Sequence, residues 1–265
     1  MGKYVIVVES GSDVTPELCE RYDIVRVPMH VTISDETVED GSIDPLEIYS
    51  RCNEFGVMPK TSGCAPADFS RVYDRIHAEQ PDAIILHLAY SEATTCSHQS
   101  SKIAAKGRDY VYSMDTRFVS VGQSLVVVET AKYIEAHPDA TVDEIFDFTN
   151  SVMDRVLLGF VPTDLAFLKA GGRLSNVAFL GAHLLKIKPC IEVRDGKFVA
   201  TKKFRGSMLK CARAFIDHMT AKGEIDYSHI GLAYSVGLSK ELRDDMEVYA
   251  HDLGFKDVTW TQVGG

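Results

Sequence analysis

The first half of the chain repeats one pattern, in which a short apolar run is followed by a polar loop and then by a segment with helical spacing. The apolar runs fall at residues 4–8, 24–31, 83–88 and 110–113. The helical segments begin near residues 15, 44 and 66, pass through 103–104, and extend over 119–136. Because wholly apolar strands are typical of a parallel sheet covered on both faces, this half is predicted to be a doubly wound α/β domain.

The pattern changes after His137-Pro138, where hairpin signals mix with helices. Arg194-Asp195-Gly196 is a turn signal between two predicted strands, 189–193 and 197–202. Further strands are predicted at 156–161, 230–234 and 258–263, and helices at 141–153, 164–169, 177–185 with Ser175 as its cap, 208–219 and 239–253. We therefore predict two domains: residues 1–140 with the parallel sheet, and residues 141–265 as a mixed-sheet α/β domain.

Composition and charge narrow the classes of function. The 265 residues carry a formal net charge of −10, which argues against a nucleic-acid-binding protein. The apolar core of the first run is too short for a signal peptide or a membrane span, so we expect no stable membrane insertion and a cytoplasmic location. The six cysteines are widely spaced, which disfavours zinc and disulfides, and we expect neither a metal nor a cofactor.

Hydroxyl side chains follow several of the predicted strands. They are Ser10, Thr61, Ser62, Ser91, Thr95 and Ser97. In doubly wound domains ligands bind beyond the carboxyl ends of the strands, so these hydroxyls are predicted to face one crevice. Pro66 is suited to the first turn of a helix, whose N-terminus favours an anion. An ordinary capped surface helix is the alternative interpretation of this stretch.

Several motifs resemble those of one known family. Thr61-Ser62-Gly63-Cys64-Ala65-Pro66 resembles that family's T-S-Q-P-S-P, and residues 91–101 are similar to its S-x-x-L-S-G-T-Y-Q-S-A. Residues 165–175 resemble its L-x-Y-L-K-K-G-G-R-I-S, and Ile187-Lys188-Pro189 matches its I-K-P. Lys203-Phe204-Arg205 matches its K-x-R. The family is the DegV family of bacterial fatty-acid-binding proteins.

The resemblance implies a two-domain α/β protein that binds one long-chain fatty acid between its domains. It also implies that the protein is not itself an enzyme, and that it presents the bound acid to a separate fatty-acid kinase. By motif position the head-group residues are Thr61, Ser62 and Thr95, with Ser10 close by. Apolar residues near Gly171-Gly172-Arg173, namely Phe167, Leu168, Phe179, Leu180 and Leu184, are candidates for the wall of an acyl tunnel, or else plain core.

Some interpretations stay open at this point. Arg173 and Arg205 could clamp a phosphate, form structural ion pairs, or belong to a docking face for a kinase. The chain has no G-x-S-x-G elbow and no G-x-x-x-x-G-K-[ST] loop, which disfavours a serine hydrolase and a nucleotide-dependent enzyme. The alternative function is a small-molecule phosphotransferase related to dihydroxyacetone kinase subunits, which rests on fold analogy.

Three smaller expectations concern single residues. Cys64 and Cys96 lie in polar loops but are expected to be small neighbours of a pocket rather than nucleophiles. His30, His87 and His98 are expected to be buried and hydrogen-bonded rather than catalytic. If the strand at 258–263 points towards the crevice, Gly264-Gly265 arrive near the head group.

Overall fold

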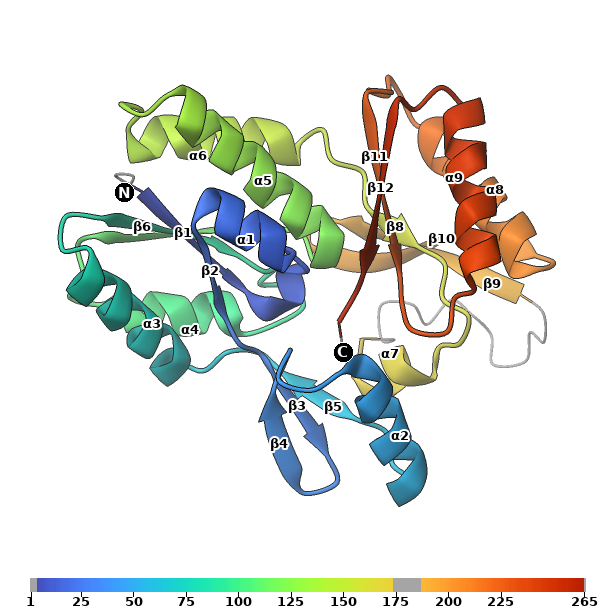
Figure 1. The fold of residues 1–265 in the computed structure, drawn as a ribbon, viewed down its shortest axis with the longest axis horizontal. Coiled ribbons are helices and arrows are strands. Elements are labelled where there is room, and N and C mark those ends of the chain that lie inside the picture. The colour runs from blue at the N-terminus through green and yellow to red at the C-terminus, as the bar shows by residue number, and fades with distance from the viewer. Residues whose placement is uncertain (1–3, 174–186, 265) are drawn as a thin grey trace. The chain divides into compact units, whose positions relative to one another are not determined.

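The computed structural model describes residues 4–173 and 187–264, in two compact units. Unit 1 comprises residues 1–156 with 264–265, and unit 2 comprises residues 157–263 (Figure 1). The predicted helix at 177–185 and its cap Ser175 lie outside the described residues. No helix in the described ranges is long and apolar enough to cross a membrane.

Unit 1 is built on a four-stranded parallel sheet with the strand order β2-β1-β6-β7. Its strands are β1 (Tyr4–Glu9), β2 (Ile24–Val27), β6 (Ile84–Ala89) and β7 (Val111–Asp115). All six residues of β1 are buried, as a central strand covered on both faces requires. The predicted doubly wound sheet is confirmed.

Helices cover both faces of this sheet because successive strand residues point to opposite sides. The helices are α1 (Pro16–Tyr22), α3 (Pro66–Glu79), α4 (Ser97–Ala104) and α5 (Ser120–Ala136). Val5 and Val7 pack with Phe69 of α3 and Ala104 of α4. The alternate residues Ile6 and Val8 pack with Val127 and Ala131 of α5, on the face that α1 also covers (Figure 1).

A small antiparallel sheet with the order β4-β3-β5 also belongs to unit 1. It consists of β3 (His30–Ile33), β4 (Glu36–Glu39) and β5 (Lys60–Ser62), and it packs against α2 (Pro45–Phe55). The predicted single strand at 24–31 is therefore two strands in different sheets, separated at Pro28-Met29. Pro28 has no N–H donor, so it cannot continue the hydrogen-bond ladder of β2.

Helix α6 (Val142–Met153) places the boundary between the units after residue 156 rather than at residue 140. Its predicted cap is confirmed, because the Thr141 side chain accepts a hydrogen bond from the N–H of Glu144. The helix packs on α5, where the hydroxyls of Thr130 and Thr149 are 3.0 Å apart. Ile145 is buried against the base of the parallel sheet, so α6 is part of the unit 1 core.

Unit 2 is a mixed α/β domain, as predicted. β9 (Ile187–Arg194) and β10 (Lys197–Arg205) form a hairpin, and β8 (Gly159–Phe160) pairs with β9 on its other edge. The predicted turn is present, with Asp195 and Gly196 at φ values of 48° and 74°. A separate parallel pair and three helices complete the described part: β11 (His229–Tyr234), β12 (Asp257–Gln262), α7 (Ala166–Ala170), α8 (Met208–Thr220) and α9 (Lys240–Asp252).

Candidate functional site

In the parallel sheet of unit 1, the direction in which the chain adds strands reverses between β1 and β6. The chain moves from β1 outwards to β2, and β6 then pairs with the opposite edge of β1. The loops that leave two such strands diverge, which opens a crevice at their carboxyl ends. The short 3-10 helix Ser10–Ser12 follows β1, and the loop at residues 90–96 follows β6. The predicted hydroxyls at Ser10, Ser91 and Thr95 therefore belong to these two loops.

Gly63 allows the end of β5 to approach the loop that leads into α4. A Cβ on this residue would overlap Thr95 Oγ1 and would lie 2.5 Å from Ser97 Oγ. Real side chains do not come so close, so only glycine permits this approach. The structure thus brings Thr95 and Ser97 against Gly63, which directly follows Thr61 and Ser62.

Hydrogen bonds join these two segments. The N–H of Cys64 donates to Ser97 Oγ at 3.1 Å, and Ser97 Oγ lies 3.2 Å from Thr95 Oγ1. The N–H of Ser97 also donates to Thr95 Oγ1, at 3.4 Å. Ser97 is fully buried, whereas Thr95 is only half-buried. Ser97 therefore supports the loop, and the Thr95 hydroxyl lies nearer to solvent.

The N-terminus of α3 is closed by the protein's own groups. Ala65 is the N-cap, and its N–H donates to the Asp68 carboxylate at 2.8 Å. The preceding N–H, of Cys64, is already bound to Ser97. Asp68 also places a negative charge in the first turn, where the helix dipole favours it. The capped-helix interpretation is the one that fits this end, and the hydroxyls of Thr61 and Ser62 belong to β5 rather than to the cap.

Ser10 and Ser91 have structural contacts within unit 1. Ser10 Oγ donates to Asp40 at 2.6 Å and accepts the N–H of Met29 at 3.0 Å, so its single proton is in use. Ser91 is fully buried, and its carbonyl accepts the N–H groups of Thr94 and Thr95. Ser10 thus fixes its own loop to Asp40 and Met29, and Ser91 anchors the turn that leads to Thr95. Their part in ligand binding stays a prediction.

A second carboxylate, Asp13, lies beside the loop that follows β1. It accepts hydrogen bonds from Ser120 Oγ at 2.5 Å and from the N–H of Gly264 at 3.0 Å. Burial raises the pKa of Asp13 to about 6, with a smaller contribution from the charge of Asp40, and the two hydrogen bonds oppose the rise. Gly264, which belongs to unit 1, is thus held at this loop, and its place near a head group stays a prediction.

The predicted residues of unit 2 lie around α7 and at the end of β10. Phe167 is 44% exposed, and Leu168 is half-buried. The guanidinium of Arg173 donates to the carbonyl of Gly171, and its N–H donates to the carbonyl of Leu168. Arg205 is exposed at the end of β10, opposite Ile187. Arg173 thus stabilises its own turn, and the phosphate, ion-pair and docking hypotheses for both arginines stay open.

Comparison with known proteins gives the family. A family profile described as "Uncharacterised protein, DegV family" matches residues 3–259. A protein of Thermotoga maritima named fatty acid-binding protein is 30% identical over 223 residues, which is 82% of this chain and 76% of the relative. The chain belongs to the DegV family.

Solved structures of DegV proteins have the same fold. A DegV family protein from Thermus thermophilus, described as fatty acid binding, has a TM-score of 0.85 at 26% identity over 99% of this chain and 93% of its own. The Fatty Acid Kinase (Fak) B3 protein of Streptococcus pneumoniae, loaded with linoleic acid, has a TM-score of 0.79 over 100% of this chain and 93% of its own. At 17% identity, that second likeness concerns the fold alone. The Thermotoga and Thermus relatives are described as fatty-acid-binding proteins, not as enzymes.

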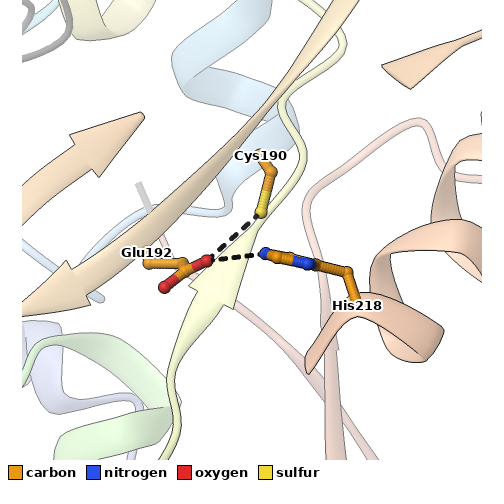
Figure 2. A group of neighbouring side chains, drawn as sticks. All are labelled: Cys190, Glu192 and His218. Atoms are coloured by element: carbon orange, nitrogen blue, oxygen red, sulfur yellow. Dashed lines mark hydrogen bonds and ion pairs between the residues drawn. The ribbon is translucent and has the colours of Figure 1, made fainter. Parts of the chain in front are cut away.

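Unit 2 of this DegV chain contains a group of side chains with metal-binding atoms. Cys190 and Glu192 lie on β9, and His218 lies on α8, with their ligand atoms within 4.8 Å of one another (Figure 2). Glu192 Oε1 is 3.0 Å from His218 Nε2 and 4.0 Å from Cys190 Sγ. The three donor types would suit zinc if they were available.

The donors of this group are already engaged. Glu192 is 3% exposed, and it accepts hydrogen bonds from Thr201, Arg194 and Lys222 as well. Burial would raise the pKa of Glu192, but these bonds outweigh it and lower the pKa to about 2. Burial raises the pKa of the Cys190 thiol, so a metal would have to displace the thiol proton. The metal would also have to bind close to the positive charges of Arg194 and Lys222, which both contact Glu192. We interpret the group as an ion-pair network that fixes α8 to β9.

Sequence reasoning gave roles to hydroxyls but not to the carboxylates around them. Three carboxylates contact the loops of the site, those of Glu9, Asp13 and Asp40. Their neighbours in the sequence form no motif that would predict these contacts. Cys64 is fully buried and donates to the carbonyl of Pro28, and burial raises the pKa of its thiol, which fits the packing role that was expected. Cys96 is exposed.

The three histidines are only partly satisfied. His30 Nε2 lies 3.8 Å from an Asp68 oxygen, which is too far for a hydrogen bond. His98 Nδ1 is 2.8 Å from Glu92, but its buried Nε2 has no hydrogen-bond partner in the described parts of the chain. His87 is fully buried, and its Nε2 likewise lacks such a partner. The expectation of buried, hydrogen-bonded rings therefore holds for only some of the ring nitrogens.

We expect the substitution Gly63→Ala to destabilise this DegV chain by about 1–3 kcal/mol, because the new methyl group overlaps the hydroxyls of Thr95 and Ser97. Urea unfolding measures the change. Gly223→Ala is the matched control, since a Cβ there meets no atom within 4 Å, and we expect it to be neutral or to stabilise by about 0.4–1 kcal/mol. Equal effects of the two substitutions would contradict the close approach.

We expect Glu192→Gln to lower the free energy of unfolding by about 1–3 kcal/mol at pH 7, because its partners lose a buried, charged acceptor. Since the folded pKa lies near 2 and the ordinary value is 4.5, the stabilisation is complete above pH 4.5 and is lost as the pH falls towards 2. Urea unfolding of both proteins between pH 2.5 and 7 should show the difference shrinking. The exposed Glu54→Gln is the control, and a pH-independent difference would refute the network.

Proposed function

We propose that this DegV chain binds a single long-chain fatty acid, with the carboxylate at the hydroxyl loops of unit 1. Two observations support the proposal. Relatives in the same family are described as fatty-acid-binding proteins. In addition, Gly63 brings Thr95 and Ser97 next to the Thr61-Ser62 strand, which gathers several hydroxyls at the carboxyl end of a doubly wound sheet. This second observation carries the proposal.

Thr95 is the best placed donor for the carboxylate. Ser97 Oγ receives the N–H of Cys64, and it can in turn donate its own proton to Thr95 Oγ1. The Thr95 oxygen then accepts from both Ser97 Oγ and the Ser97 N–H, which leaves its own proton for a ligand. Such chains of hydrogen bonds polarise one another, so the last hydroxyl is a stronger donor to an anion. Ser97 acts through Thr95 in this arrangement.

The pairing of β5 distinguishes the two remaining candidate hydroxyls, those of Thr61 and Ser62. Thr61 pairs with Val31 and Ser62 with His30, so their side chains point to opposite faces of the strand. A Cβ on Gly63 would point at Thr95. We propose that the chain stays extended from β5 through Gly63, so that Thr61, two residues earlier, faces the same way. Thr61 is therefore the second head-group donor, and Ser62 contributes less.

The acyl chain supplies most of the affinity. Burying about 14 methylenes at ~0.8 kcal/mol each gives a gross gain of ~11 kcal/mol. Each hydroxyl bond to the carboxylate adds roughly 1.5–3 kcal/mol. Phe167 and Leu168 are candidates for the apolar contacts, since Phe167 is 44% exposed in unit 2. The hydroxyls orient the acid, and the apolar surface retains it.

We also propose that the bound carboxylate is presented to a separate fatty-acid kinase. The resemblance to the DegV motifs and the shared fold with the linoleic-acid-loaded Fak B3 protein support this step. Arg205, exposed at the end of β10, is a candidate contact for that partner, as is Arg173. Such a role fits a cytoplasmic protein, and the six free cysteines are consistent with that location.

Mass spectrometry of an organic extract of the natively purified protein tests the proposal. We expect about one fatty acid per chain, because the acyl contribution to affinity is large. Delipidated protein should also take up oleate or palmitate in a fluorescence displacement titration. Absence of lipid from the extract together with no uptake would reject fatty-acid binding, and would favour the phosphotransferase alternative.

We expect Thr95→Ala and Thr61→Ala to weaken oleate binding by roughly 1–3 kcal/mol each, because each removes a hydrogen bond to the carboxylate. Ser62→Ala should have a smaller effect, since this side chain faces the other side of β5. Thr95→Ser keeps the hydroxyl and should bind nearly as well as the natural chain. Affinities are measured by displacement titration, and equal affinity of Thr95→Ala and Thr95→Ser would move the head-group site elsewhere.

A further inference from the structure

Glu9 is a fully buried carboxylate at the carboxyl end of β1. Its Oε2 accepts the N–H of Tyr90 at 2.8 Å and the side-chain amide of Gln123 at 3.3 Å. Its Oε1 faces Nε2 of His87, also fully buried, at 3.3 Å. Neither of these two facing atoms has a hydrogen-bond partner among residues 4–173 and 187–264. Each therefore has only the other.

The hydrogen bonds on the far side of His87 have a fixed direction. Ser101 Oγ donates its single proton to the carbonyl of His98, at 2.8 Å. Ser113 Oγ, 3.2 Å from Ser101 Oγ, must then be the donor to Ser101. With its own proton used, Ser113 can only accept from Nδ1 of His87, which is 2.9 Å away. Nδ1 of His87 therefore carries a proton.

The facing pair needs one further proton. If Nε2 of His87 carried none, its lone pair would face a carboxylate oxygen inside the core, where an unpaired charge is costly. Burial would raise the pKa of Glu9, but the charge of His87, its hydrogen bonding and the Tyr90 N–H together lower that pKa. Two N–H groups, those of Tyr90 and Gln123, already donate to Oε2 of Glu9, which favours its ionised form, and this geometry assigns the proton to Nε2 of His87.

This chain of contacts holds both ends of the loop that carries Thr95. At the start of the loop, the N–H of Tyr90 binds Glu9 directly. At its end, the carbonyl of His98, in the first turn of α4, receives the proton of Ser101. Between these points the connection runs through His87 and Ser113. The partners come from β1, β6, β7 and α4, so the loop is fixed against the sheet itself.

We propose that Glu9 and doubly protonated His87 form a neutral buried ion pair that positions the loop at residues 90–96 for a carboxylate ligand. The inference rests on the proposed function for its ligand, but not for the pair itself. Neutrality matters because an unpaired Glu9 charge beneath the loop would repel an anion. Glu9 is a positioning residue in this arrangement, since its bonds are to Tyr90, Gln123 and His87.

Nitrogen NMR of the delipidated protein tests the pair without any ligand. Protein labelled with ¹⁵N in its histidine rings is recorded at pH 7, and the His87 signals are assigned by their loss in His87→Gln. We expect both ring nitrogens to show the imidazolium signature. In Glu9→Gln, which keeps an acceptor for the Tyr90 N–H, one nitrogen should become unprotonated. A neutral His87 ring in the natural chain would overturn the proposal.

Amide hydrogen exchange and ligand release test the positioning. In Glu9→Gln we expect the amides of Thr94 and Thr95, which bind the Ser91 carbonyl, to exchange at least tenfold faster. Oleate should dissociate at least tenfold faster as well. Thr149→Val is the matched control, because it removes another buried hydroxyl of unit 1, which bonds to α6 and α5 rather than to the loop.

The outcomes separate this inference from the proposed function. If the natural chain takes up no oleate, the proposed function fails, and the ring spectra and loop exchange still decide on the pair. If the natural chain binds oleate but Glu9→Gln leaves exchange and dissociation unchanged, the inference alone fails. Equal acceleration in Thr149→Val would assign the effect to general destabilisation and would also overturn it. Should Glu9→Gln not fold, Glu9→Asp with the natural-chain spectra replaces it.

Discussion

The central position of β1 is the constraint on which unit 1 depends. This strand is buried along its whole length and pairs with β2 on one edge and β6 on the other. Its carboxyl end therefore lies at the point where the neighbouring loops diverge, and Glu9, its last residue, is fully buried there. Glu9 and Ser10 lie at that point, so the strand order of the sheet fixes where the loops that contact them lie.

The hydroxyl loops are arranged by close packing of backbone rather than by a helix dipole. The N-terminus of α3 is satisfied by Asp68 and Ser97, so it has little remaining attraction for an anion. Gly63 instead allows two segments, far apart in sequence, to share hydrogen bonds through Thr95 and Ser97. A neutral hydroxyl donor suits the proposed carboxylate ligand, because no ion pair has to be broken when the ligand leaves.

Two buried glutamates show different uses of charge in the same chain. Glu192 lies among Thr201, Arg194, Lys222 and His218, which lower its pKa to about 2 and leave its lone pairs occupied. Glu9 instead faces His87, which we propose is charged, and accepts hydrogen bonds from two neutral donors. A carboxylate with many partners fixes elements in place. A carboxylate that faces a single buried imidazole, as Glu9 does, depends on the proton between the two groups. Replacing Glu9 is therefore expected to change the position of the loop at residues 90–96.

Features that depend on neighbours along the chain could be predicted from the residues alone. The apolar runs gave the parallel sheet, Thr141 gave a helix cap, and Asp195-Gly196 gave the hairpin turn, because each is a local preference of backbone or side chain. The motifs around Thr61 and Gly171-Gly172-Arg173 indicated the family, which the comparisons confirmed.

Contacts between residues far apart in the sequence depend on how the elements pack in three dimensions. Glu9 and His87 face each other because β1 pairs with β6, and periodicity does not encode the order of strands in a sheet. For the same reason the hydrogen bond between Asp13 and Gly264, which are 251 residues apart, could not be predicted from the sequence. The boundary after residue 156 could not be predicted either, since the amphipathic face of α6 does not say which core it covers. A side chain's local pattern gives its element, whereas its partner depends on how elements pack.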